Sequence, residues 1–239
     1  MIIQEKSENC IYAVTVTKAG IKHMALEEPN QDSNAFLIMG SDMVMAVADG
    51  VGSCKKAEIA SQNACSLCTE MFCDLVSRKD RASCEEIASM IINRWNAFLE
   101  GKNGIEYCTT LKAVFVVDGI LSAVSIGDGL LMVALDGEAI SSPVDGNDFL
   151  NQTDCLSPGI SEESVWICQR SVDRKDYTVF MSTDGVSNYI SAGREKDLIN
   201  EISRIAGEET LKDELISFFN EIRLVSADDM TLGVIRCGR

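Results

Sequence analysis

The chain has 239 residues, of which 46% are hydrophobic and only three are proline, and its formal net charge at pH 7 is −16. This length suffices for a sizeable core, and no Pro/Gly/Ser-rich linker or internal repeat divides it, so we expect one domain over residues 1–239. A strongly acidic surface is repelled by phosphate backbones and anionic lipids, which argues against nucleic acid and membrane partners.

The cysteines bear on the expected compartment. The sequence begins without a charged-then-apolar signal peptide, and no apolar run reaches the roughly 18 residues of a membrane-spanning helix. The ten cysteines therefore indicate reduced, mostly buried thiols in a cytoplasmic protein. Cys65 and Cys68 form a C-x-x-C, but without a second pair or a nearby histidine this spacing favours one face of a helix over a zinc site.

The first half of the chain predicts strands followed by two helices. Residues 10–20 alternate and are rich in β-branched side chains, which is typical of a strand. Residues 33–50 predict two strands joined by a turn at residues 40–42. Apolar residues at helical spacing then predict helices over residues 56–76 and 82–99.

The second half predicts a meander, a long loop and a closing helix pair. Residues 109–140 predict three or four strands joined by tight Asp-Gly turns, so neighbouring strands should pair antiparallel. The polar loop over residues 141–165 is long enough to be functional. Strands follow at residues 165–170 and 177–185, then helices at 194–205 and 208–222, and a last strand at 230–237. This order predicts an α+β fold with two packed, mostly antiparallel sheets flanked by helix pairs.

Acidic residues stand at the ends of several apolar strands. Any one of them could be a turn or cap residue, but together they should converge at one edge if the strands are neighbours. They are Asp32, Asp49, Asp128, Asp184 and Asp228. Converging carboxylates repel one another unless a hard divalent cation binds, and a chain with a single histidine favours Mg²⁺ or Mn²⁺ over zinc. Two such ions about 3.5–4 Å apart activate a shared water for in-line attack on phosphorus, which predicts a phosphate ester hydrolase.

Six segments, in order, resemble the metal-dependent protein phosphatases (PPM, type 2C). They are GIKHMALEEPNQDSNAF, VMAVADGVGS, CTTLKAVFV, SIGDGLLMV, MSTDGVSNYI and SADDMTLGVI. The opening G-x-x-H and P-x-Q-D pattern is most similar to a bacterial stand-alone subgroup. The resemblance implies an α-β-β-α sandwich and a protein serine/threonine phosphatase that uses a hydroxide bridged by two Mn²⁺ or Mg²⁺ ions. It also implies phosphoserine or phosphothreonine protein substrates in signalling, with a cognate kinase as a further partner.

The resemblance also implies roles for individual residues. Asp49 would bridge both metals, and the Gly50 carbonyl would ligate the first of them. Asp184 and Asp228 would hold the second. Asp32 matches the position that orders metal-bound water from behind the ligands.

Three further features carry over from the family. Asp128 matches the position of a third, weaker metal, bound with help from Asp184. Thr109 and Thr110 match paired threonines that we interpret as structural support. The segment of about residues 142–163 matches a variable flap that contacts substrate.

The sequence departs from the family at four positions near the site, one of which is Asp229, since Asp228-Asp229 replaces the common Asp-Asn pair before the last strand. Gln31 replaces the usual glutamate before the first aspartate, and Glu27 falls near the usual phosphate-binding arginine. Val51 stands where some relatives have a histidine that serves as general acid. His23 could take over phosphate binding or proton donation, or it could be a structural histidine.

Two other phosphoryl-transfer mechanisms fit the sequence less well than a metal-dependent phosphatase, and one non-catalytic alternative stays open. Cys168 and Arg174 fit the C-x5-R of cysteine phosphatases, but the loop between them lacks the glycines that open backbone N–H groups to phosphate. Val47 leaves Asp49 without the D-x-D pair of phosphoaspartate enzymes. The alternative that stays open is a non-catalytic phosphopeptide-binding or regulatory module on the same fold.

Overall fold

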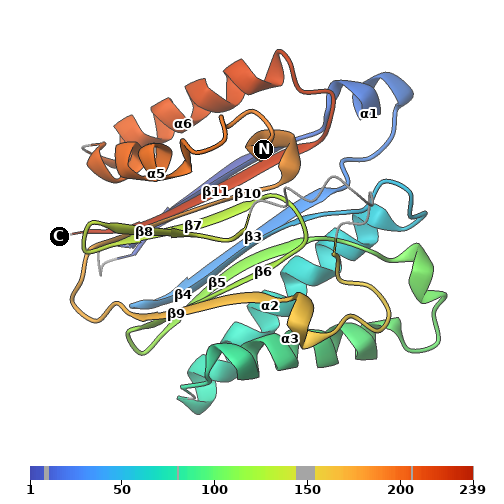
Figure 1. Ribbon diagram of the computed structural model, residues 1–239, viewed down its shortest axis with the longest axis horizontal. Helices are drawn as coiled ribbons and strands as arrows, with labels where there is room; N and C mark the ends of the chain where they lie inside the picture. Colours follow the sequence, from blue (N-terminus) through green and yellow to red (C-terminus); the bar gives the residue numbers. More distant parts are fainter. Residues whose placement is uncertain (8–10, 80, 144–153, 206, 239) are drawn as a thin grey trace.

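In the computed structural model, which describes residues 1–7, 11–79, 81–143, 154–205 and 207–238, two antiparallel sheets pack face to face between two layers of helices (Figure 1). The first sheet has the order β1 (Ile2–Lys6), β2 (Ile11–Lys18), β11 (Met230–Cys237), β10 (Tyr177–Ser182), β7 (Leu130–Leu135), β8 (Glu138–Ser141). The second has the order β3 (Asp32–Met39), β4 (Asp42–Asp49), β5 (Leu111–Val117), β6 (Ile120–Ile126), β9 (Trp166–Ser171).

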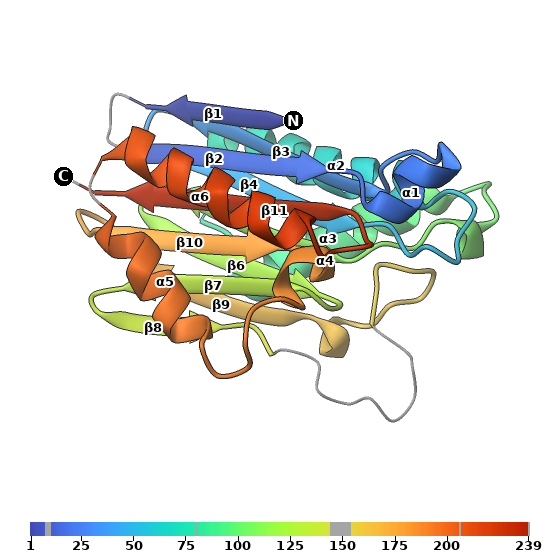
Figure 2. The same cartoon turned by 90° about the horizontal axis from the view of Figure 1, so that it is seen from above.

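Each sheet is covered on its outer face by one pair of helices. The pair α5 (Glu195–Arg204) and α6 (Glu208–Arg223) lies over the first sheet, whose strands and covering helices are seen from above in Figure 2. The pair α2 (Ala57–Arg78) and α3 (Cys84–Leu99) covers the second sheet. The expected α-β-β-α sandwich is therefore confirmed.

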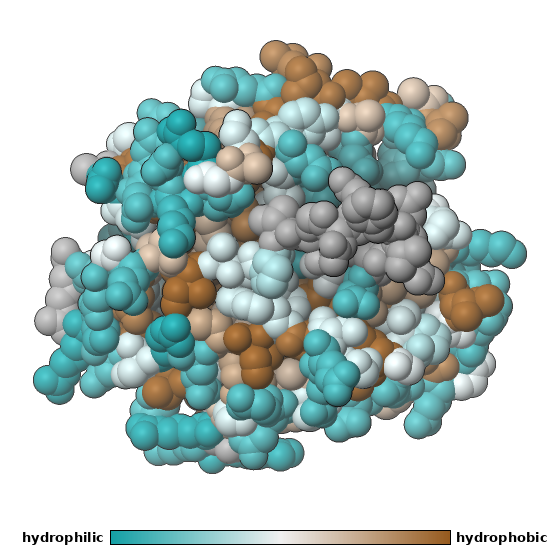
Figure 3. Space-filling view, viewed as in Figure 1, coloured by the Kyte–Doolittle hydropathy of each residue, from teal (hydrophilic) through white to brown (hydrophobic). Residues whose placement is uncertain are grey.

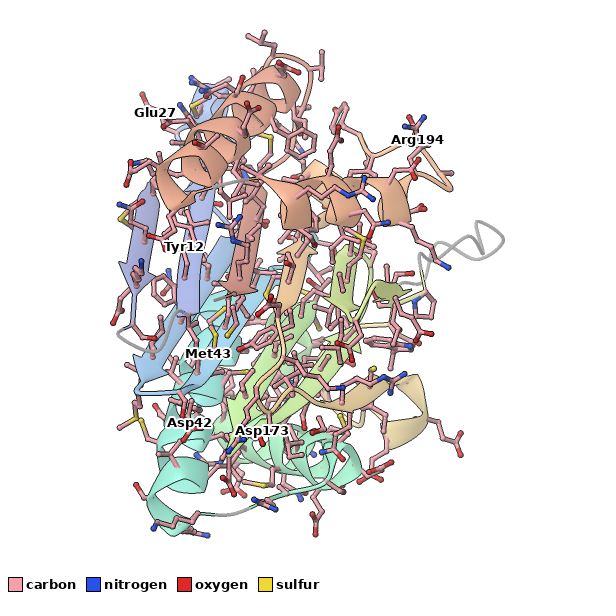
Figure 4. All side chains as sticks on the ribbon, turned by 90° about the vertical axis from the view of Figure 1, so that its left-hand side faces the viewer. Tyr12, Glu27, Asp42, Met43, Asp173 and Arg194 are labelled. Carbon is pink, nitrogen blue, oxygen red and sulfur yellow. The ribbon has the colours of Figure 1, made fainter. Side chains whose placement is uncertain are left out.

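Three apolar layers hold these elements together. Trp95 and Phe72 fill the layer between the second sheet and its helices, and both are fully buried. Met43, labelled in Figure 4, lies in the layer between the two sheets. Tyr12 lies on the outer face of the first sheet with Phe219 of α6 in the third layer (Figure 4). Burial of apolar surface from four element layers is the main stabilising contribution.

Local sequence signals determine where the elements begin and turn. Ser83 caps α3 by accepting from the Glu86 N–H, and the Glu86 carboxylate accepts from the Ser83 N–H, so the pair forms a capping box. Asp118 and Asp136 adopt positive φ in the hairpin turns before β6 and β8, as the Asp-Gly pattern predicts.

Some expectations need correction or addition. The strand β1 and the short helices α1 (Ile21–Leu26) and α4 (Asp184–Ser187) were not predicted, and Asp184-Gly185 begins a helical turn instead of continuing the strand predicted over residues 177–185. The C-x-x-C pair Cys65 and Cys68 is buried on one side of α2, as expected for a helix face. Within the described residues, none of the helices combines the length and apolar character needed to cross a membrane.

The structure shows whether Cys168 and Arg174, the C-x5-R pair, flank a phosphate-binding loop. Cys168 is buried in β9, where it lies opposite Ala123 in the regular antiparallel pair with β6. Arg174 is exposed and adopts φ of 57° in the connection to β10. A phosphate-binding loop between them is therefore excluded, because most of the intervening residues continue the strand.

Candidate active site

The candidate site lies at the end of the sandwich where β3 and β11 begin and β4 and β10 end. Asp49 closes β4 of the second sheet, and Asp184 opens α4 directly after β10 of the first sheet. Asp228 precedes β11, the neighbour of β10. The structure therefore brings acidic residues from both sheets to one place, as their positions at strand ends predict.

Asp32 and Asp49 are direct partners in the β3–β4 pair. Side chains of directly opposed residues lie on the same face of a sheet, with Cβ atoms about 5 Å apart. Thr183, at the end of β10, donates from its hydroxyl to Asp32 Oδ2 at 2.8 Å. This hydrogen bond joins the two sheets immediately beside the acidic cluster.

The two threonines fix the backbone of Asp49. The Thr110 hydroxyl accepts from the Asp49 N–H at 3.0 Å, and the Thr110 N–H donates to the Asp49 carbonyl at 2.8 Å. The Thr109 hydroxyl donates to the same carbonyl, also at 2.8 Å. Both side chains thus hydrogen-bond the backbone of Asp49. These contacts are consistent with the structural support expected of the two threonines.

Gly50 is required by the close approach of α2. A Cβ at this position would lie 2.3 Å from the Ala57 carbonyl oxygen in the first turn of α2. The Gly50 N–H donates to the Gln31 carbonyl at 3.1 Å, which leaves the Gly50 carbonyl to other partners. Gly185 is equally constrained, because its Cβ would lie 1.9 Å from the Asp229 carbonyl oxygen. Both glycines of the Asp-Gly pairs therefore allow the backbone to pack tightly around the cluster.

The acidic residues perturb one another's titration. Burial, together with repulsion from Asp229 and Asp184, raises the pKa of Asp32 to about 8, although the hydrogen bond from Thr183 lowers it. Burial, followed by repulsion from Asp32 and Asp184, raises the pKa of Asp49 well above its ordinary value. The pKa of Asp184 is also raised, by burial first and then by Asp128. Buried carboxylates whose pKa values are raised by their acidic neighbours have the electrostatics of a cation site.

Two buried oxygens test whether the donor set fits a divalent metal. Asp32 Oδ1 and Asp184 Oδ1 are buried without a hydrogen-bond partner. Buried polar atoms are normally paired, and unpaired carboxylate oxygens at a shared site are what an oxygen-preferring cation satisfies. In the described part of the chain, no group of three His, Cys, Asp or Glu side chains already has the closed arrangement of a metal site. The residues present nevertheless fit Mg²⁺ or Mn²⁺ in chemistry, through oxygen donors alone.

A buried pair, His23 and Asp229, adjoins the cluster. His23 is the buried residue of α1, and its Nδ1 lies 2.8 Å from Asp229 Oδ2. Asp229 also accepts from the Gly20 N–H at 2.7 Å and the Gln31 N–H at 2.6 Å. The sequence marks Asp229 only as a departure from the family and gives it no role, because its contacts with His23, Gly20 and Gln31 appear only in the folded chain.

Lys112 is a residue that sequence reasoning missed. It is 1% exposed, and its Nζ donates to the Gly127 carbonyl at 2.6 Å and to the Ile126 carbonyl at 3.3 Å. Both flanking residues of the Gly127-Asp128-Gly129 turn adopt positive φ, so only glycine suits them well. Lys112 therefore holds the turn that carries Asp128 in place through these two carbonyl groups. A lysine inside an apolar strand pattern is the sequence signal that could have identified it.

The site opens into a cavity of about 750 Å³. Every predicted site residue except Asp32 lines it, and Asp32 is buried on β3 opposite Asp49. The cavity is lined by His23, Asp49, Gly50, Asp128, Asp184 and Asp228, and also by Gln31, Val51, Lys22 and Lys55. Residues 144–153 of the expected flap lie outside the described residues, and Leu156 pairs with Thr109 beside the site.

Comparison with known proteins places this geometry in context. Among solved structures, RsbX in complex with magnesium has a TM-score of 0.66 at 17% identity, covering 100% of both chains. The catalytic domain of the serine/threonine protein phosphatase PstP in complex with two manganese ions has a TM-score of 0.63 at 16% identity, covering 96% of this chain and 99% of that one. Stp1, a serine/threonine phosphatase from Staphylococcus aureus, has a TM-score of 0.63 at 13% identity, covering 98% of both chains.

The sequence itself gives the family. No curated protein matches the chain in sequence. The family model described as Protein phosphatase 2C matches residues 19–220, which is well over half of the chain and includes the expected segments from His23 to Asp184. The expected resemblance is confirmed, and the chain belongs to the protein phosphatase 2C family.

Proposed function

We propose that this chain is a metal-dependent phosphomonoester hydrolase that acts on phosphoserine and phosphothreonine in proteins. The observation that carries the proposal is the convergence of Asp49, Asp184 and Asp228 from two sheets on one cavity, with buried carboxylate oxygens that lack partners. Membership of the protein phosphatase 2C family supports the same activity. The solved relatives named above, two of which hold magnesium or manganese, support Mg²⁺ or Mn²⁺ as the cofactor.

We assign two ions to four groups of the chain. Asp49 and the Gly50 carbonyl would hold the first, and Asp49, Asp184 and Asp228 would hold the second. Asp128 would bind a third, weaker ion. When bound, the two ions supply Lewis acidity and lower the pKa of water, so that a nucleophile exists at neutral pH without a reactive side chain.

The remaining residues act by positioning and proton transfer. Asp32, buried on β3 opposite Asp49, would orient the attacking water through a carboxylate oxygen. His23, fixed through Nδ1 by Asp229, would contact the phosphate or return a proton to the departing serine or threonine oxygen. Val51 carries no titratable group, so the proton donor of some relatives has no equivalent at that position.

The proposal extends to organisation and partners. We place the whole chain in one domain, with the flap of about residues 142–163 beside the cavity. A phosphoprotein is the expected substrate and a cognate kinase a further partner. The cysteines that the structure describes are in thiol form, which supports a reducing compartment such as the bacterial cytoplasm.

A direct experiment is hydrolysis of p-nitrophenyl phosphate and of a phosphothreonine peptide by the purified chain with Mn²⁺, Mg²⁺ or chelator. We expect turnover that requires a divalent ion and is lost in Asp49→Asn. Activity that survives chelation or this substitution would contradict the two-metal assignment. If Mn²⁺ binds but no substrate is hydrolysed, the chain is the phosphopeptide-binding module instead.

A further inference from the structure

The helix α1 has an unusual distribution of side chains. Its sequence, IKHMAL, is mostly apolar, yet His23 is its buried residue. The exposed fractions of Ile21, Met24 and Leu26 are 49%, 45% and 59%. A surface helix normally buries its apolar side chains and exposes its polar ones, so α1 has the reverse arrangement.

A second exposed apolar group lies beside α1. Leu224 and Val225, in the connection after α6, are 80% and 64% exposed. Their connection is bound to the start of α1, because the Lys22 N–H donates to the Ala227 carbonyl at 3.2 Å. Figures 1 and 2 both show the C-terminal end of α6 next to α1, and brown atoms gather there in Figure 3.

Together these side chains form one surface, which we call the apolar rim. It comprises Ile21, Met24, Leu26, Leu224, Val225 and Tyr189, whose hydroxyl donates to the Val225 carbonyl at 3.0 Å. Among the described residues, the other exposed large hydrophobic side chains lie elsewhere, on β1, at Met39 and at Ile105. A contiguous exposed apolar surface of this kind commonly marks a binding site.

The apolar rim is continuous with the catalytic cavity. Leu26 belongs to the rim and also lines the cavity. Lys22 and His23, on the same helix, line the cavity as well. On the other side, Asp228 lines the cavity only three residues after Val225. A substrate whose phosphorylated side chain reaches the acidic cluster can therefore place the residues that flank it on this rim.

Charge distinguishes the candidate occupants. Glu27 and Glu28 are exposed at the end of α1, and the chain as a whole carries −16. A second copy of this chain would bring the same acidic groups to the rim and would be repelled. A substrate segment with apolar and basic residues suits both the rim and its acidic border.

We propose that the apolar rim binds apolar residues that flank the phosphoserine or phosphothreonine of a protein substrate. The proposal rests on the phosphatase activity proposed above and adds the substrate class that the site selects. A small phosphate ester occupies the cavity alone and gains nothing from the rim. The rim therefore favours phosphoproteins over small esters by contacts outside the reacting group.

The test uses the full chain with Mn²⁺ and three substrates. These are p-nitrophenyl phosphate, a phosphothreonine peptide with leucines on both sides of the phosphothreonine, and its twin with serines in their place. The variants are Met24→Ser and Leu224→Ser, neither of which lines the cavity. Met39→Ser is the matched control, because Met39 is also 45% exposed but is the last residue of β3, at the opposite end of that strand from the site.

We expect wild type to prefer the leucine peptide by about 25-fold in kcat/KM, through KM, since each of the two half-buried apolar contacts contributes about fivefold. Met24→Ser and Leu224→Ser should each remove most of this preference and leave turnover of p-nitrophenyl phosphate and of the serine peptide unchanged. Met39→Ser should behave as wild type. Equal kcat/KM for the two peptides in wild type overturns the proposal, as does a loss in Met39→Ser as large as in Met24→Ser.

Two further outcomes separate this proposal from the activity on which it rests. If wild type hydrolyses none of the three substrates, the phosphatase is refuted, and fluorescence anisotropy of the labelled leucine peptide still tests the rim through the same variants. If sedimentation shows a dimer that Met24→Ser dissociates while peptide KM stays constant, the rim binds a second copy and the substrate proposal is wrong.

Discussion

Asp32 and Asp49 oppose each other directly in the antiparallel β3–β4 pair, where like charges destabilise a sheet. Burial and mutual repulsion raise the pKa of both carboxyl groups. A fold that keeps such a pair has a local instability in the metal-free protein that a bound divalent cation relieves. Stability and metal binding should therefore be coupled through these two residues.

The first prediction concerns Asp49→Asn. Removing one charge from the cluster should raise the Tm of the chelator-treated protein by a few degrees, because repulsion on Asp32 and Asp184 falls. The same change should abolish the rise in Tm that Mn²⁺ gives the wild type, since binding to the folded state is the source of that rise. Thermal unfolding with chelator and with Mn²⁺ measures both effects.

The control for Asp49→Asn is Asp173→Asn, an exposed residue far from the cluster in the connection to β10. It reduces the net charge of −16 by the same amount. It should leave both Tm values close to those of wild type. If Asp173→Asn stabilises the metal-free protein as much as Asp49→Asn does, the effect belongs to overall charge and not to the cluster.

The second prediction concerns the pH dependence of stability without metal. The folded pKa of Asp32, about 8, is above its ordinary value of 3.8, because burial disfavours the charged form. A raised pKa contributes stability that is present below about pH 4 and is lost as pH rises through about 8. The Tm of chelator-treated protein should therefore fall between pH 5 and pH 8.5, and Asp32→Asn should flatten that slope.

Mn²⁺ should reverse the trend, because the ion competes with protons for the same carboxylates. The Tm in saturating Mn²⁺ is then expected to rise over this pH range. A Tm of the chelator-treated wild type that rises with pH would show that Asp32 is ionised in the folded protein. An unchanged slope in Asp32→Asn would assign the dependence to other groups.

The sequence predicts much of this site because its aspartates lie at or next to the ends of strands. The hairpin turn between β3 and β4 is so short that it sets the register, and the register places Asp32 opposite Asp49. The apolar alternation of these strands and their Asp-Gly ends is local information. The convergence of four strand ends at one edge follows once the strands are known to pair as neighbours.

Other features depend on contacts that no local pattern contains. The hydrogen bond between Thr183 and Asp32 joins residues of different sheets, and the roles of Asp229 and Lys112 appear only when distant backbone groups surround them. The helix α1 was not predicted, because exposing its apolar side chains and burying His23 contradicts the helical pattern. That contradiction itself points to function, as local rules are most often broken at binding sites.

The third prediction separates two roles of His23. If it returns a proton to the leaving oxygen, His23→Asn should lower kcat/KM for a phosphothreonine peptide by about 10²–10⁴, because an alkoxide leaves poorly without a proton. For p-nitrophenyl phosphate, whose leaving group needs no proton, the loss should be below about tenfold. Asp229→Asn should show the same pattern in weaker form, since Asp229 holds His23 through Nδ1.

Equal losses for both substrates would assign His23 to phosphate binding or to structure. Glu28→Gln is the control, because Glu28 Oε2 lies 3.7 Å from the other ring nitrogen of His23 but is exposed. It should alter neither rate by more than about twofold, as exposed ion pairs contribute little.

The fourth prediction concerns Lys112, which donates to the carbonyls of Ile126 and Gly127 below the Asp128 turn. In Lys112→Met these buried carbonyls lose their donor, so the free energy of unfolding in urea should fall by about 2–4 kcal/mol. Asp128 would be presented less firmly, and the Mn²⁺ concentration for half-maximal activity should rise. Lys175→Met, which removes the exposed pair with Asp136, should cost about 1 kcal/mol or less. Equal losses in the two variants would mean that Lys112 contributes no more than a surface charge, and an unchanged Mn²⁺ requirement would separate the turn from metal binding.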